Sequence, residues 1–111
     1  MIEIIIYNYL KQNLSVPAYI QKPKDVPDNF VFFEKTGSMN YNHITTTTVA
    51  FQSYGKSRAE AAMLNEELKE VVYNMVELKE ISAVRLNSDY EFTDLDTKHY
   101  RYQAVFDITN Y

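Results

Sequence analysis

The sequence predicts an α+β domain with a mostly antiparallel sheet of about four to five strands, one long helix packed across it and a shorter N-terminal helix. Three observations predict this. Four consecutive threonines lie within Ile44–Tyr54, where branching at Cβ favours extended backbone. An apolar stripe at helical spacing runs from Ala61 to Leu78. His99–Thr109 alternates as strands do. At 111 residues, a single domain spanning residues 1–111 is expected.

The N-terminal segment Ile2–Asn13 is predicted to be a helix. The β-branched run at positions 4–6 would favour a strand by itself, but a helix places Glu3 and Lys11 on a shared polar side. A short strand is expected at Ala18–Gln21, followed by a polar connector with two prolines over Lys22–Asn29. The apolar residues of the helix recur at steps of three and four: Ile2, Ile5, Ile6, Tyr9 and Leu10.

Phe30–Lys35 is apolar on both faces for several residues and is therefore predicted to be a central strand. Thr36–His43 is rich in turn-forming residues and is expected to be a long hairpin connection before the strand Ile44–Tyr54. The same loop carries Met39 and Tyr41, residue types common at adaptable binding surfaces. A binding loop is the alternative interpretation.

The long helix has a clear start signal. Gly55 relaxes the backbone after the strand, and Ser57 followed by Glu60 forms the S-x-x-E capping box. Apolar residues then continue through about Leu78, with Asn65 among the residues expected to face away. Three carboxylates on this helix are interpreted as solvated charges rather than as an acid/base or metal cluster: Glu66, Glu67 and Glu70.

The C-terminal third is predicted to be an antiparallel hairpin. Ile81–Phe92 alternates, with an irregularity or bulge expected at Asn87–Asp89. A polar turn over Thr93–Lys98 leads into the closing strand His99–Thr109.

Composition excludes several function classes. The formal net charge is −4 and the isoelectric point is about 5.1, which argues against a protein whose main task is to grip a phosphate backbone. Cysteine is absent, so disulfides, thiolate nucleophiles and Cys-ligated zinc are excluded together. No stretch approaches the roughly 20 apolar residues of a membrane span, and the N-terminal run lacks the features of a signal peptide.

Neither a catalytic residue, a cofactor site nor a metal site is predicted. No G-x-S-x-G, Walker, Rossmann or H-E-x-x-H motif occurs, and two glycines are too few for a phosphate-cradling loop. His43 and His99 are not spaced as a ligand pair. An acidic stretch lacks the glycine and terminal glutamate of a calcium loop and is interpreted as an acidic rim: Asp89, Glu91, Asp94 and Asp96.

Two stretches carry a family resemblance. N-F-V-F-F-E-K-T-G at 29–37 and T-T-T-V-A-F-Q-S-Y-G-K-S-R-A-E-A-A-M-L-N-E-E-L-K at 46–69 resemble small neck and tail-completion proteins of long-tailed bacteriophages and prophages. The nearest likeness is to the tail-terminator, or tail-to-head joining, proteins. The resemblance spans nearly the whole chain, and its motifs are structural.

The resemblance implies a structural, non-enzymatic protein that forms a ring, usually a hexamer, on the end of the tail tube. Such a ring ends tail polymerisation and joins tail to head. The implied partners are other copies of the chain, the tail-tube protein and a head-completion or connector protein. DNA would pass through the ring without specific binding, and no cofactor or membrane would take part. The implied location is the virion neck or tail, after assembly in the host bacterial cytoplasm.

The candidate assembly contacts are in two loops, Gly37–His43 and Asp94–Lys98. An acidic inner surface would suit DNA passage, because like charges repel. Two alternatives remain: a head-completion or connector protein of the same neck, and an unrelated small ligand-binding or enzymatic α+β domain. The candidate contact residues are Met39, Tyr41, His43, Asp94, Asp96 and Lys98.

Overall fold

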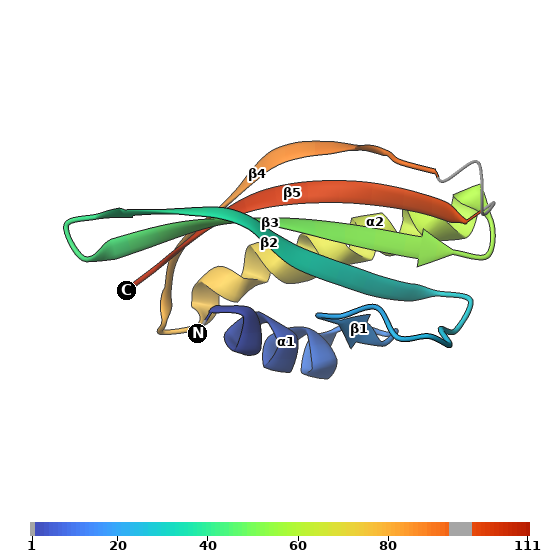
Figure 1. The fold of residues 1–111 in the computed structure, drawn as a ribbon, viewed down its shortest axis with the longest axis horizontal. Helices are drawn as coiled ribbons and strands as arrows, with labels where there is room; N and C mark the ends of the chain where they lie inside the picture. The colour runs from blue at the N-terminus through green and yellow to red at the C-terminus, as the bar shows by residue number, and fades with distance from the viewer. Residues whose placement is uncertain (1, 94–98) are drawn as a thin grey trace.

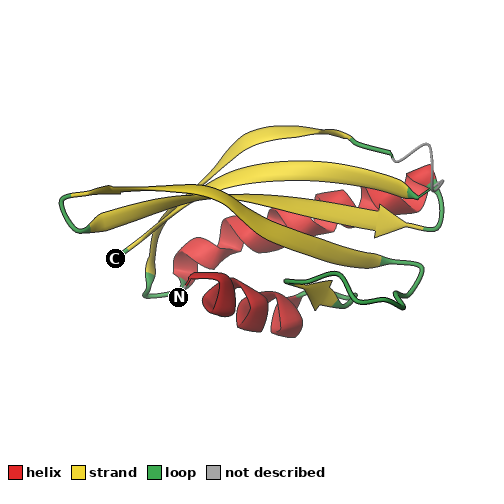
Figure 2. Ribbon diagram, in the orientation of Figure 1, coloured by secondary structure: helices red, strands yellow, loops and turns green. Residues whose placement is uncertain are grey.

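A five-stranded sheet in the order β1-β2-β3-β5-β4 forms one layer, and two helices pack against one of its faces (Figures 1 and 2). This computed structural model describes residues 2–93 and 99–111. All strand pairs are antiparallel except β1 with β2. The predicted fold class is therefore confirmed. The elements are α1 (Ile2–Asn13), β1 (Ala18–Tyr19), β2 (Phe30–Tyr41), β3 (Ile44–Gly55), α2 (Arg58–Tyr73), the 3-10 turn η1 (Asn74–Glu77), β4 (Ile81–Glu91) and β5 (Tyr100–Asn110).

The N-terminal segment is a helix, as predicted, despite its β-branched run. Ile2, Ile6 and Leu10 are buried against the rest of the chain. The Tyr9 hydroxyl donates a hydrogen bond of 2.6 Å to the carbonyl oxygen of Val71, which ties α1 to α2. Burial, together with the negative charge of Glu77, raises the pKa of Tyr9, so this hydroxyl keeps its proton.

The predicted helix cap is confirmed. The Ser57 side chain accepts a hydrogen bond of 3.2 Å from the backbone N–H of Glu60. Gly55 lies so close to the first turn of α2 that a Cβ at this position would be 2.3 Å from the backbone nitrogen of Ala61. Glycine is needed here because of this close approach.

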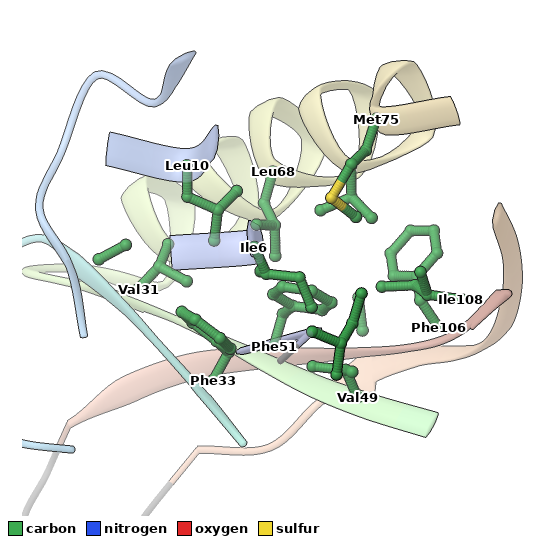
Figure 3. Close-up of a cluster of buried hydrophobic side chains, with 14 of the residues drawn as sticks. Ile6, Leu10, Val31, Phe33, Val49, Phe51, Leu68, Met75, Phe106 and Ile108 are labelled. Carbon is green, nitrogen blue, oxygen red and sulfur yellow. The ribbon is translucent and has the colours of Figure 1, made fainter. Parts of the chain in front are cut away.

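The hydrophobic core lies between the helices and the face of the sheet that they cover, called here the covered face (Figure 3). Phe51 of β3 is at its centre, with its ring centroid 5.6 Å from that of Phe33 and 5.8 Å from that of Phe106. Burial of this many large side chains supplies most of the favourable free energy of folding. The largest fully buried members are Phe33, Phe51, Phe106, Ile6, Leu10, Leu68, Met75, Ile108, Val31, Val49 and Val72.

The opposite face, called here the open face, carries cross-strand hydrogen bonds between polar side chains. Thr46 and Thr109 are 3.0 Å apart, and Gln52 donates to Gln103 at 3.0 Å. The Thr48 hydroxyl donates to Asp107 at 2.8 Å. These bonds link β3 to β5, and their partners are directly opposite each other in the register.

The structure corrects the prediction of a long loop at Thr36–His43. β2 continues to Tyr41, and only Asn42 and His43 form the turn into β3. The register shifts between Lys35 and Gly37, and this bulge breaks the alternation from which the strand would have been recognised. The predicted irregularity in the next hairpin is confirmed, since the β4 register shifts between Leu86 and Ser88.

Candidate assembly surface

The most prominent surface feature is the end of the β2–β3 hairpin, residues 36–48, called here the arm. In Figure 1 its tip projects beyond the other strands, while the β3 side of the arm is paired with β5 as far as Thr45. The molecule measures 44 × 24 × 24 Å. Every residue of β2 from Glu34 to Tyr41 is exposed, whichever face it points to. Twelve-residue strands are long for a domain of this size. The β2 side of the arm therefore buries little surface within the chain, whereas Thr47 on the β3 side is buried.

A two-residue turn closes the arm. Asn42 and His43 both have positive φ, 50° and 67°. Two successive positive-φ residues are typical of the type I′ turn, whose twist matches that of the flanking strands. Asparagine and histidine are found in this conformation more often than most residues, although glycine alone adopts it without steric cost. His43 thus lies at the extreme tip of the arm.

The tip carries large apolar side chains in water. Met39 is 68% exposed, Tyr41 75% and Ile44 43%. The register pairs Tyr41 with Ile44 and Met39 with Thr46, so all three apolar residues share the open face with Thr46. Grouped exposed apolar side chains of this kind mark interaction sites more often than isolated ones do.

The sheet also has two unpaired edges within the described residues. β1 pairs only with Val31 and Phe32, which leaves the outer edge of β2 open from Glu34 onward. β4 is the last strand on the other side, with its outer edge open along its length. Unpaired edges are templates for pairing with another chain. Together with the arm, they are the candidate assembly surface.

The predicted site residues fall into two groups. Met39, Tyr41 and His43 lie together on the arm and are exposed, on a strand and a turn rather than on a long loop. The other three candidate contacts lie outside the described residues: Asp94, Asp96 and Lys98. Sequence reasoning missed the open edges, because they depend on the order of strands in the sheet.

The acidic stretch is engaged in ion pairs where the structure describes it. Asp89 accepts a hydrogen bond of 2.8 Å from Asn65 and another from Lys69. The bond that Lys69 donates to Asp89 is the main cause of the raised pKa of Lys69. Hydrogen bonds from Thr93 and Arg58 lower the pKa of Glu91. Within residues 2–93 and 99–111, no three His, Cys, Asp or Glu residues are grouped as metal ligands would be.

Asn65 was expected to face away from the sheet, and this is wrong. It is 2% exposed because β4 passes over the α2 surface and brings Asp89 to it. Two nearby carboxylates of α2 have partners within the chain. The Glu66 Oε1 atom is 3.0 Å from Lys69 Nζ. The Glu67 carboxylate accepts hydrogen bonds from the backbone N–H and the hydroxyl of Ser15.

Two hollows in the described part of the chain are of interest, one small and one larger and more open. A hollow of about 210 Å³ lies beside the stacked rings of Phe30 and Tyr54, and His99 is on its rim. Its volume is below the 300 to 1,000 Å³ typical of ligand pockets. Lys22 lies 4.8 Å from the centre of the Tyr54 ring, and Arg101 donates to the Tyr54 hydroxyl at 2.9 Å. These cations hold the 22–28 segment and β5 against the aromatic pair.

A second, more open hollow of about 400 Å³ lies on the covered side, between α2 and the β4 edge. It is lined by Glu66, Glu67, Lys69, Glu70, Tyr73, Asn74 and Leu86. Three carboxylates and one amine make its rim acidic. Leu86 and Tyr73 provide an apolar floor.

None of the helices in the described ranges is long and apolar enough to cross a bilayer.

Comparison with known proteins adds no relative to these observations. No protein-family model matches this chain, and no curated protein is significantly similar to it.

Proposed function

We propose that this chain is a structural, ring-forming protein of a bacteriophage neck, and that it caps the tail tube, ends tail polymerisation and joins the tail to the head. The observation that carries the proposal is the arm, which presents Met39, Tyr41 and Ile44 to water beside two unpaired sheet edges. Association with another protein would remove these apolar side chains from water and would pair the free backbone groups of the edges, and both changes are favourable. The sequence resemblance to tail-terminator proteins supplies the biological setting.

In this proposal the function is binding alone. Copies of the chain associate with one another in a ring, and the arm contacts a neighbouring protein through the exposed side chains of Met39 and Tyr41. One side of the ring faces the tail-tube protein and the other the head-completion or connector protein. DNA passes through the opening without sequence-specific contacts.

Native mass spectrometry of the purified chain tests the ring directly. A closed oligomer, six copies if the resemblance holds, is expected at high protein concentration. Electron microscopy should show the protein at the ends of tail tubes. A protein that stays monomeric and does not associate with tube ends would contradict the proposal. Co-purification with the portal instead of the tube would assign it to head completion.

The double variant Met39→Ser/Tyr41→Ser tests whether the arm is responsible. Both side chains are exposed, so the monomer should keep its fold and its thermal midpoint. The oligomer should be lost or weakened at least about tenfold, as expected when a buried apolar anchor is removed from an interface. Met63→Ser on α2 is the matched control, because Met63 and Met39 are equally exposed at 68%. Equal assembly of all three proteins would exclude the arm.

A further inference from the structure

We infer that neighbouring copies join edge to edge, with the outer edge of β2 in one copy pairing antiparallel with the outer edge of β4 in the next. The inference rests on the proposed ring and names the surfaces that build it. The occupant of each open edge is thus a second copy of this chain.

Strand directions permit this pairing of β4 in one copy with β2 in the next, called here the joint. β2, β3, β5 and β4 alternate in direction across the sheet, since each neighbouring pair is antiparallel. β4 therefore runs opposite to β2. A copy related by rotation about an axis along the strands keeps its strand directions, so its β2 meets the first copy's β4 as an antiparallel partner. The open faces of all copies then lie on the same side of a continuous sheet.

The joint is heterologous, because two different edges meet. A heterologous contact repeats from copy to copy and closes into a ring when the rotation allows. The alternative of two β2 edges pairing with each other would give a two-fold dimer and leave both β4 edges open. The open lengths also suit each other, with eight exposed residues from Glu34 to Tyr41 against the 11 residues of β4.

Charge on the open face favours one register. Glu34 is exposed at the start of the free β2 edge. On the β4 edge, the Arg85 side chain is 81% exposed, and its contact with Asp107 is long at 3.4 Å. Asp107 also bonds to Thr48, which places Arg85 on the open face. Glu34 is on the same face, because it pairs with Ala50 and Ala50 lies two residues from Thr48 along β3. Setting Glu34 opposite Arg85 pairs opposite charges across the joint.

The same register is complementary on the covered face. It places Lys35 opposite Val84, two residues from Leu86 on the same side of β4. Leu86 is in the floor of the hollow whose rim carries Glu66, Glu67 and Glu70. An incoming Lys35 would therefore meet a predominantly acidic rim. The tip of the arm would continue past Ile81 toward η1, where Val76 is 46% exposed.

Disulfide trapping tests the joint cleanly, because the chain contains no cysteine. Glu34→Cys and Arg85→Cys are made singly and together. Under oxidation, the mixture of the two single variants should give a covalent dimer, while each alone should give none. The double variant should give a ladder of bands up to the size of the ring. Glu34→Cys combined with Lys11→Cys, on the exposed surface of α1, is the control and should give no ladder.

The outcomes separate this inference from the proposed function. A ring seen by native mass spectrometry without cross-linking at 34 and 85 would overturn the edge pairing and leave the ring intact. Cross-linking of Glu34→Cys with itself would overturn it in favour of the two-fold dimer. Absence of any oligomer would contradict both proposals.

Charge reversal provides a second test that does not depend on thiol chemistry. Glu34→Arg and Arg85→Glu should each weaken ring assembly by about tenfold or more, because like charges then face each other. The double variant should restore it. Circular dichroism of each monomer shows whether the fold is kept. A double variant no better than the single variants would contradict the register.

Discussion

Asp107 shows how one side chain links three strands. Burial alone would raise its pKa, but hydrogen bonds from Thr48, Asn87 and Arg85 outweigh burial and lower the pKa below the ordinary aspartate value. Thr48 lies on β3 and the other two donors lie on β4, with Asp107 on the strand between them. The charged form of Asp107 therefore stabilises the folded sheet.

Asp107→Asn should lower the free energy of unfolding by about 1 kcal/mol at neutral pH, because bonds to a charged acceptor become weaker neutral ones. Since the folded pKa lies below the unfolded one, the contribution of Asp107 is complete above the unfolded pKa. It is lost as the pH falls through the folded pKa. The difference in free energy of unfolding between wild type and variant, measured by urea denaturation, should therefore disappear as the pH falls from about 5 to about 2.

Asp25→Asn, in the exposed connector, is the control for this change and should alter stability by less than about 0.5 kcal/mol. A gap that stays constant over the same pH range would show that the Asp107 charge does not stabilise the fold.

Among the elements, the arm depends on its turn. His43 adopts φ of 67°, a conformation that glycine takes without steric cost. His43→Gly would create the Asn-Gly sequence most typical of the type I′ turn. We expect it to stabilise the protein by about 0.5 kcal/mol, measured by urea denaturation.

Ser38→Gly is the matched control within the arm. Ser38 pairs with Thr47 in regular strand, so glycine there should destabilise the protein by about 0.5 to 1 kcal/mol. The two substitutions are expected to have opposite signs. Two changes of the same sign would show that the turn geometry does not limit stability.

Local sequence patterns predicted the helices and most of the strands. When one side of a helix or one face of a strand is buried, apolar residues recur in the sequence at the spacing of that element. They did not predict the outer half of β2. There both faces are exposed, a bulge shifts the register after Lys35, and the turn contains no glycine. That strand is defined by its pairing with β3. Likewise, Asn65 is buried by a strand that is distant in sequence, so helical periodicity alone placed it outside.

The candidate surface was predictable only in part. Met39 and Tyr41 were identified from residue type and neighbouring turn-formers, and both are exposed. The unpaired edges follow from the strand order β1-β2-β3-β5-β4, which places the last strand of the chain inside the sheet. No local pattern encodes that order.

For the whole molecule, ring formation should couple stability to concentration. A ligand that binds only the folded state stabilises it by mass action, and a second copy acts as such a ligand. The thermal midpoint of the wild type should therefore rise with protein concentration. Met39→Ser/Tyr41→Ser should show no such dependence, and its midpoint should match that of dilute wild type. Scanning calorimetry over a hundredfold range of protein concentration measures both thermal midpoints. A wild-type midpoint that does not change with concentration would contradict the coupling of stability to ring formation.

The polar open face has a consequence for how the chain finds its native pairing. Thr46, Thr48 and Gln52 each meet a matching side chain on β5 only when the two strands are aligned as observed. A slip of one residue would turn these groups toward the helices and move Val49 and Phe51 into water. A misaligned β3–β5 pair is thus penalised on both faces at once. The face that contributes least to the core thus also contributes to discrimination against wrong alignments during folding.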